Sequence, residues 1–263
     1  MLAPWIIDHF PPHRVYTEAF GGAASVLLRK PRSYAEVYND LDGEVVNLFR
    51  VLQSGAGAAR LERVLRATPF ARAEFELAYK KSKDPVERAR RLIIVSFMGF
   101  GSNGHNTEVR TGFRANSNRS STAPAHDWAN YPECMAAFVE RMQRVVIESK
   151  DAISIIEQHD QDDALHYVDP PYVHSTRDAG GRQRDYRHEM DDAAHQDLAR
   201  VLRAARGGGG PKRLSLPPVR AALRGMAPGG EGCSRRRCAQ ARRGPLDQRR
   251  RVAGWREFVL RGR

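Results

Sequence analysis

The fold is decided by the stretch Leu165-His166-Tyr167-Val168-Asp169-Pro170-Pro171-Tyr172, in which an apolar run ends in an acid, two prolines and an aromatic residue. Proline has no backbone N–H, and it biases the residue before it towards an extended backbone. The stretch therefore predicts a strand that runs to about Val168 and stops, with residues 169–172 at its carboxyl edge. Open α/β sheets bind their ligands at this edge, so Asp169 is a candidate functional residue.

These four residues suit one kind of chemistry, the methylation of an exocyclic amino group. The amino nitrogen of adenine is a poor nucleophile, because its lone pair is delocalised into the ring. The Asp169 carboxylate and the Pro170 carbonyl can accept its two hydrogens, which localises the lone pair and aims it at an electrophilic methyl group. Pro170 and Pro171 stiffen that carbonyl, and Tyr172 offers a face on which a flipped-out base can stack. The alternative is an ordinary proline turn at the end of a strand.

Composition indicates one α/β domain with an inserted or appended element, because the chain has 263 residues of which 41% are hydrophobic. No window of about 18 residues is apolar enough for a membrane span, and charged residues interrupt the first 14 positions where a signal peptide would lie. Cys134, Cys233 and Cys238 do not have the spacing of a disulfide framework or a zinc site. We therefore expect a cytoplasmic protein.

Positive charge is confined to the end of the chain. The formal net charge is +12, but residues 206–263 carry +13 and residues 1–205 carry −1. The overall charge is therefore no sign that the folded part binds nucleic acid.

A nucleotide-binding unit is predicted near the start of the chain. Residues 15–22 indicate a short strand that runs into the turn Phe20-Gly21-Gly22, and residues 23–30 are expected to form the helix after it. A second strand over residues 34–38 ends at Asp40, which follows Gly22 at nearly the spacing of an acid that contacts ribose hydroxyls. Two alternatives stay open: the turn has no ligand, or Asp40 caps the helix expected over residues 41–52, a role that Asn39 could also fill.

Taken together, the motifs point to a family. Phe20-Gly21-Gly22, Tyr38-Asn39-Asp40 and Asp169-Pro170-Pro171-Tyr172 resemble, in this order, motifs I, II and IV of the adenine-specific DNA methyltransferases of the Dam type. The resemblance covers roughly residues 3–206, and about 130 residues separate Asp40 from Asp169, as the family's target-recognition region requires.

This resemblance implies an α/β, Rossmann-like, S-adenosylmethionine-dependent methyltransferase with a helical target-recognition insert. Residues 1–54 would be the cofactor-binding part, 55–144 the insert and 145–206 the catalytic part. The implied reaction is methyl transfer from S-adenosylmethionine to N6 of adenine in double-stranded DNA, by a monomer and without a metal. The implied cofactor-binding residues are Phe20, Gly21, Gly22, Asp40 and Asp169, and the implied catalytic residues are Asp169, Pro170, Pro171 and Tyr172. Methylation of RNA or of a protein amide by the same motif is an alternative.

Residues 43–98, which include the first part of the insert, are predicted to be helical, and the insert then changes character. Lys80-Lys81-Ser82-Lys83 is most simply the solvated end of a helix. Residues 100–125 are rich in Gly, Asn, Ser and Arg, whose groups can donate to phosphates and base edges. By family likeness we expect Arg110, Arg114 and Arg119 to contact DNA, the alternative being a disordered insert.

The next elements complete the predicted domain. We expect an amphipathic helix over residues 126–144, a strand over 145–148, and a helix over 152–159 whose preceding Asp151 either caps it or approaches the cofactor adenine. A last helix is expected over residues 188–206. His166, His174, His188 and His195 lack the spacing of metal ligands, so surface positions are expected for them.

The two ends of the chain do not follow the family pattern. Residues 207–263 are rich in Pro, Arg and Gly without a credible strand, and back-translation in a shifted frame allows family-like segments. We therefore interpret them as an aberrant, disordered basic tail that follows a frameshift near residues 207–210. The family's first Trp-x-Gly-Gly-Lys motif is missing before Met1. An inactive remnant of such an enzyme is therefore the second interpretation of the chain.

Overall fold

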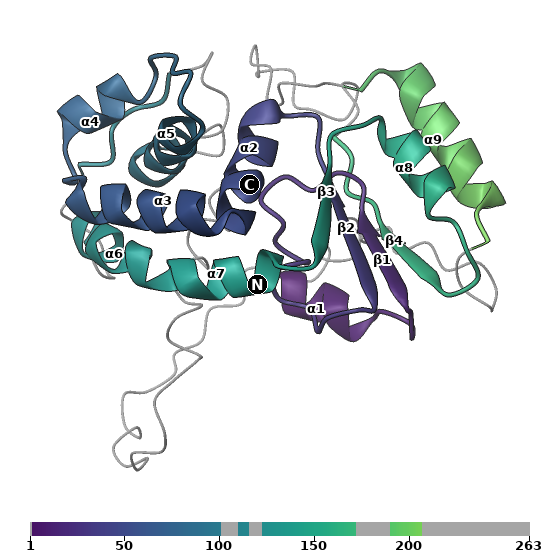
Figure 1. Ribbon diagram of the computed structural model, residues 1–263. Helices are drawn as coiled ribbons and strands as arrows, with labels where there is room; N and C mark the ends of the chain where they lie inside the picture. The colour runs from purple at the N-terminus through teal and green to yellow at the C-terminus, as the bar shows by residue number, and fades with distance from the viewer. Residues whose placement is uncertain (1, 101–109, 116–122, 172–189, 207–263) are drawn as a thin grey trace, which may run out of the picture.

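A computed structural model describes residues 2–100, 110–115, 123–171 and 190–206 (Figure 1). The predictions for Tyr172, Arg119, His174, His188 and the tail from residue 207 lie outside these ranges. Within them the chain forms a sheet of four strands in the order β3-β2-β1-β4. The strands are β1 (Val15–Glu18), β2 (Ala35–Asn39), β3 (Val145–Glu148) and β4 (Ala164–Tyr167). The predicted strands are therefore present, and the predicted α/β class is confirmed.

All the strand pairs are parallel. Val15 of β1 lies opposite Ala35 of β2 on one side and Ala164 of β4 on the other, and Glu36 of β2 lies opposite Val145 of β3. Every residue of β1 is buried, as expected for the central strand of a sheet covered on both faces. Because the strands are parallel, their carboxyl ends share one edge, at the top of Figure 1, while α1 (Leu2–Asp8) lies by the opposite edge.

Helices cover both faces of the sheet (Figure 1). On one face lie α8 (Ala152–Gln158) and α9 (Asp192–Ala204), which pack through Ile156, Leu198 and Leu202 against Ala19 and Val168. The other face carries α2 (Gly43–Gln53), which joins the sheet to the predicted insert. The insert consists of α3 (Gly55–Ala67), α4 (Arg72–Leu77), α5 (Pro85–Met98), α6 (Pro124–Asn130), the 3₁₀ helix η1 (Tyr131–Cys134) and α7 (Met135–Met142).

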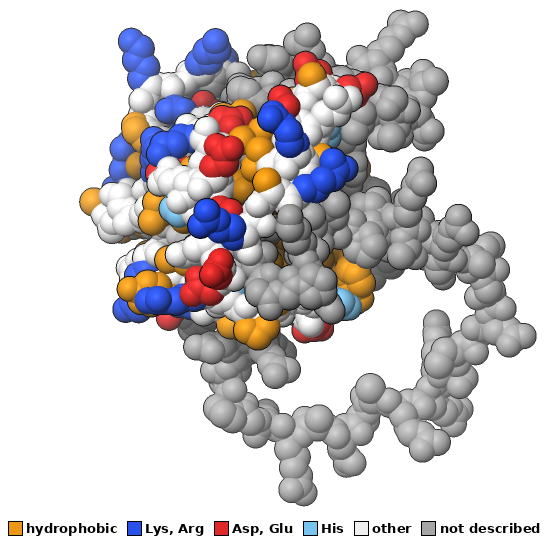
Figure 2. Space-filling model, turned by 90° about the vertical axis from the view of Figure 1, so that its right-hand side faces the viewer, with side chains coloured by type: hydrophobic (Ala, Val, Ile, Leu, Met, Phe, Trp, Pro, Cys, Tyr) orange, Lys and Arg blue, Asp and Glu red, His pale blue; other side chains and the backbone are white. Residues whose placement is uncertain are grey.

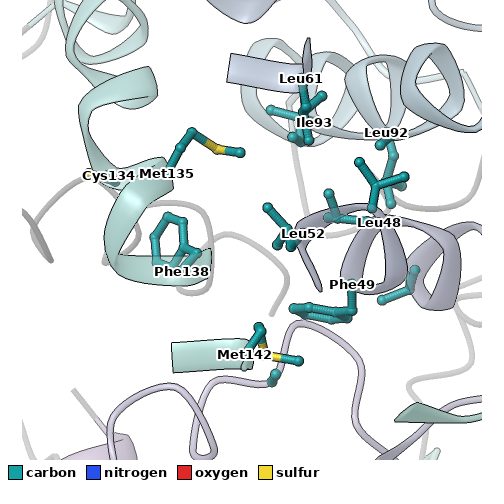
Figure 3. Packing of buried hydrophobic residues seen from close by; sticks show 14 of the residues in the cluster. Leu48, Phe49, Leu52, Leu61, Leu92, Ile93, Cys134, Met135, Phe138 and Met142 are labelled. Carbon is teal, nitrogen blue, oxygen red and sulfur yellow. The ribbon is translucent and has the colours of Figure 1, made fainter. Parts of the chain in front are cut away.

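One hydrophobic cluster joins the insert to the sheet. Leu48, Phe49 and Leu52 of α2 meet Leu61 of α3, Ile93 of α5 and the Met135, Phe138 and Met142 side chains of α7 (Figure 3). The two ends of the insert also meet at one side chain, because Gln53 Nε2 donates to Met142 O at 2.9 Å and to Val145 O at 2.6 Å. The side chain of Gln53 thus ties the exit of α2 to the entry of β3.

A buried ion cluster fixes the amino end of β2. Glu36 accepts from Lys30 Nζ at 2.7 Å and from both terminal nitrogens of Arg141 on α7, at 2.6 and 3.0 Å. Its side chain is 3% exposed and that of Lys30 is 1% exposed. Burial opposes ionisation of Glu36, but the hydrogen bonds from Arg141 and Lys30 outweigh it and hold the pKa of Glu36 below its usual value.

The prediction of a helix over residues 23–30 is wrong. These residues form turns, because Ala24 has a left-handed φ of 53° and because the Leu27 N–H donates to the Glu18 carboxylate at 2.9 Å. In a helix that began at Ala23, the same N–H would donate to a backbone carbonyl four residues earlier. A side chain from the preceding strand has taken the place of the helical bond.

Three other local predictions need correction. The cap of α2 is neither Asn39 nor Asp40 but Asp42, which accepts from Glu44 N at 2.9 Å. The single helix predicted over residues 126–144 is interrupted by η1, since Pro132 has no N–H to continue the α-helical ladder. His166 is not a surface residue, because its side chain is 6% exposed and its Nδ1 lies 2.6 Å from Thr17 Oγ1.

In the described ranges, no helix has the length and apolarity that a bilayer crossing needs.

Candidate active site

Three acidic residues lie at the carboxyl ends of adjacent strands. Glu18 ends β1, Asp40 follows β2, and Asp169 follows β4. The chain passes from β1 to β2 and β3 on one side, and then crosses to β4 on the other side of β1. The boundary between β1 and β4 is therefore a topological switch point, the place where open α/β sheets bind ligands. The structure brings the Phe20–Gly22 turn and Asp169 to the two sides of this boundary, where Ala19 N donates to Tyr167 O at 3.3 Å.

The predicted glycine turn is held by the end of β2. Gly21 N donates to Asn39 O at 2.8 Å, Gly22 N donates to Asp40 Oδ2 at 2.6 Å, and the Tyr38 hydroxyl donates to Gly22 O at 2.6 Å. A Cβ on Gly21 would lie 2.1 Å from the Tyr38 ring, and Gly22 has a φ of 47°. Both glycines are therefore required, one for close approach and one for its backbone conformation.

Space and polar groups beside this turn fit a nucleoside cofactor. A Cβ on Gly22 would meet no atom of the described residues within 4 Å, so the turn borders open space among them. Phe20 and Asp40 are both half-buried at its edge. Asp40 Oδ1 accepts from Asp42 N at 2.7 Å, which fixes the carboxylate between the glycine turn and the start of α2.

The Asp169-Pro170-Pro171 corner lies across the switch point and is half-buried. The Tyr167 hydroxyl donates to Asp169 Oδ2 at 3.4 Å, and the Pro171 carbonyl lies 2.9 Å from Nε2 of His195 on α9. An acid and two prolines thus follow β4 at the same edge of the sheet as the glycine turn.

Comparison with protein families agrees with this geometry. Residues 1–214 match the model of the D12 class N6 adenine-specific DNA methyltransferases. The chain belongs to this family. A comparison with curated protein sequences gives no match. Family and sheet together confirm the Rossmann-like methyltransferase fold, and the family's reaction is methylation of adenine in DNA, which implies S-adenosylmethionine as the methyl donor.

The same edge of the D12 methyltransferase sheet contains a buried acid that sequence reasoning did not single out, Glu18. It is 1% exposed, and its Oε2 accepts from the Tyr16 hydroxyl at 3.0 Å and from Leu27 N at 2.9 Å. Burial raises the pKa of Glu18 to about 8; the two hydrogen bonds oppose this shift and the nearby Asp169 charge adds to it. The available signal was its position, since Glu18 ends an apolar strand as Asp40 and Asp169 nearly do.

Two of the predicted DNA-contacting residues of this methyltransferase lie in the described ranges, and they differ. Arg114 is 7% exposed, and it donates from Nη2 to Gly99 O at 2.8 Å, behind the last turn of α5. Its position holds residues 112–114 against residues 98–100, where Phe100 N donates to Gly112 O at 2.8 Å. Arg110 is exposed, and its guanidinium lies 5.4 Å from the centre of the Tyr79 ring. Arg110 therefore has the exposure that a DNA contact needs, whereas Arg114 is placed to anchor the segment.

Arg110 belongs to a basic patch on the insert, defined here as Arg72, Lys80, Lys81 and Arg110. A cluster of aromatic rings lies under these cations. The guanidinium of Arg72 lies 5.0 Å from the centre of the Phe113 ring, and the centre of the Phe75 ring lies 5.7 Å from that of Phe113 and 5.3 Å from that of Tyr79. None of the four cations forms an ion pair with a described residue. Arg60, Arg66, Arg88, Arg90 and Arg91 of the same insert all do.

Two further predictions concern capping and metals. Asp151 caps α8, since its Oδ2 accepts from Ser154 N at 3.0 Å. Among the described residues of the methyltransferase, no group of three His, Cys, Asp or Glu side chains is placed to hold a metal ion.

Proposed function

We propose that this chain transfers the methyl group of S-adenosylmethionine to N6 of adenine in double-stranded DNA, with the motif order of the Dam-type enzymes. The observation that carries the proposal is the pairing of β1 with β4, which sets the glycine turn and the Asp169-Pro170-Pro171 corner on the two sides of one switch point. A methyl donor and an amino acceptor held at these two positions would meet at the sheet edge.

Phe20, Gly21, Gly22 and Asp40 would hold the cofactor, which supplies an electrophilic methyl group when bound. The open space beside Gly22 admits a ligand close to the backbone, and the Asp40 carboxylate stands at the end of β2 where it can accept from ribose hydroxyls. Asp169 would lie beside both cofactor and target base.

Asp169 and Pro170 would act on the adenine. The carboxylate and the carbonyl accept the two N6 hydrogens and so direct the nitrogen lone pair at the methyl carbon. The Asp169 carboxylate would stabilise the positive charge that N6 gains when it accepts the methyl group, and would pass the proton that N6 then releases to water. Pro171 keeps the carbonyl direction fixed, and Tyr172 would stack on the flipped-out base.

The basic patch would bind the DNA backbone near this site. Exposed cations without acidic partners are suited to phosphates, which position a duplex without reading its sequence. In Figure 1 α4 and α5 lie at the height of the carboxyl ends of the strands, so a duplex lying over the active site can also reach the patch. The insert over residues 55–144 would then serve as the target-recognition region.

Transfer of a tritiated methyl group tests the proposal. The purified chain is mixed with labelled S-adenosylmethionine and with duplex DNA, RNA or protein in separate reactions, and we expect label only in adenine of the DNA. Asp169→Ala should abolish transfer, whereas Asp162→Ala, which changes an exposed acid before β4, should not. Label in RNA or protein alone, or transfer by Asp169→Ala at the normal rate, would reject the proposal.

A further inference from the structure

His195 is the residue of α9 that contacts the Asp169-Pro170-Pro171 corner. Its Nε2 lies 2.9 Å from Pro171 O, and its Nδ1 lies 2.8 Å from Asp191 O, the cap residue of the same helix. Pro171 and His195 are 24 positions apart in sequence, so this contact joins two separate segments. Sequence reasoning assigned His195 to the surface, but the structure makes it half-buried against the corner.

The corner needs support of this kind because of its own composition. Pro170 and Pro171 have no N–H, so neither can donate to the sheet or to a neighbouring turn. Their position can be held only through their carbonyl groups and through packing. Towards a carbonyl oxygen an imidazole nitrogen can act only as a donor, and a neutral ring has one such nitrogen. With a proton on Nε2, His195 gives Pro171 O a hydrogen bond that the prolines cannot make for themselves, and the Nδ1 contact with Asp191 O is a second hydrogen bond only when both ring nitrogens carry a proton.

The place of His195 is in turn fixed by packing. Leu198 and Leu202 follow His195 at three and seven positions, and therefore lie on the same side of α9. Both are buried with Val168, which precedes Asp169, and with Ala19, which precedes Phe20. The helix that carries His195 therefore packs against the residues that precede Asp169 and Phe20.

We propose that His195 is a positioning residue for methyl transfer: its Nε2–H donates to Pro171 O and fixes the direction of the Pro170 carbonyl and the Asp169 carboxylate. The proposal rests on the proposed function for its consequence, because the direction of these groups matters only when an amino nitrogen at the corner attacks a methyl carbon. Misplacement by about 1 Å can slow an enzymatic reaction roughly a hundredfold.

Single-turnover methyl transfer with saturating cofactor and duplex measures the consequence. We expect His195→Ala to lower the rate constant by about tenfold to a hundredfold, with the affinities for S-adenosylmethionine and duplex unchanged. His195→Gln keeps an N–H donor of similar reach and should recover most of the rate. His9→Ala is the matched control, since His9 makes the same kind of ring-to-carbonyl contact, with Trp5 O at 2.6 Å, directly after α1, which lies by the opposite edge of the sheet.

The protonated ring nitrogen gives a readout that needs no activity. In ¹⁵N spectra of histidine-labelled protein, the Nε2 atom of His195 should carry a proton. A bare Nε2 would overturn the geometry even if the chain transfers no methyl, whereas absence of transfer by the unchanged protein would count against the proposed function alone. Equal rates for His195→Ala and the wild type, or equal losses for the Ala and Gln variants, would overturn the positioning role.

Discussion

At the scale of single residues, the Glu18 carboxyl group is held neutral near pH 7 because burial raises its pKa to about 8. The folded state therefore binds a proton that the unfolded state releases near pH 4.5. The stability that this proton contributes is complete below pH 4.5 and is lost as the pH rises through about 8.

We predict that the free energy of unfolding of the wild type, relative to Glu18→Gln, decreases by about 1.4 kcal/mol per pH unit within that interval. Urea unfolding of both proteins from pH 5 to pH 9 measures the difference. Burial lowers the pKa values of His13, His159 and His166, and this makes stability rise with pH, opposite to the effect of Glu18. Both proteins contain these histidines, so their effect cancels in the difference. A difference that does not vary with pH would show that Glu18 is already ionised in the folded protein.

Substitution by alanine should have different effects on stability at the two glycines of the glycine turn. Gly21→Ala should destabilise the protein by about 1–3 kcal/mol or more, because its Cβ would overlap the buried Tyr38 ring. Gly22→Ala has room and should cost only about 1–2 kcal/mol for its left-handed backbone. Thermal unfolding of the two variants checks the order, and a larger loss for Gly22→Ala would contradict it.

Sequence could identify the residues of this site that stand in motifs, and it missed those that act through tertiary contacts. Asp40, Gly21 and Asp169 follow strands and could be placed at one edge from the chain alone. The position of Glu18 at the end of a strand could be seen in the sequence, but its burial and its hydrogen bond from the Leu27 N–H could not. Arg114 looked like Arg110 in sequence, and only the fold shows that its guanidinium donates to Gly99 O.

At the scale of secondary structure elements, the Lys30–Glu36–Arg141 cluster joins β2 to α7. We predict that Glu36→Gln destabilises the protein by about 3–5 kcal/mol, because it leaves two buried cations without their carboxylate. Glu62→Gln is the matched control on the exposed pair with Arg66 and should cost at most about 1 kcal/mol. Chemical denaturation measures both losses, and equal losses would show that the cluster contributes no more than a surface pair.

The elements themselves were predictable where periodicity and turn residues agreed. The strand before Pro170 and the helices with one apolar face are of this kind. The failures occurred where a side chain or a proline replaced a backbone hydrogen bond. Glu18 accepts the hydrogen bond from the Leu27 N–H that a helix over residues 23–30 would use for its own backbone. Pro132 interrupts the helix expected over residues 126–144. Neither competition is visible in a pattern of apolar spacing.

At the scale of the whole molecule, net charge and DNA affinity have different origins. Acidic and basic side chains are interspersed on the face that carries α8 and α9 (Figure 2), in keeping with the net charge of −1 for residues 1–205. If the basic patch contacts phosphates, duplex affinity should fall with salt in proportion to those contacts, with a slope of about 0.9 per phosphate.

We predict that the triple variant Arg72→Ala, Lys80→Ala and Arg110→Ala lowers the slope of log affinity against log salt by about 3. Fluorescence anisotropy with a labelled duplex, from about 50 to about 300 mM salt, measures this slope. Arg60→Ala with Arg66→Ala removes cations that are already paired with Asp84 and Glu62, and should leave the slope nearly unchanged. Identical slopes for all three proteins would exclude the patch from the DNA interface.

The double hydrogen bond of Gln53 has a consequence for how new sequence preferences can arise. The Gln53 side chain joins the end of α2 to the start of β3, so the segment between these two elements begins and ends at the same place in the fold. Chimaeras that exchange this segment between relatives should keep their methyl-transfer machinery in register, provided that the glutamine and the apolar face of α2 are retained. Evolution could then diversify target choice by cassette replacement, with the chemistry inherited unchanged.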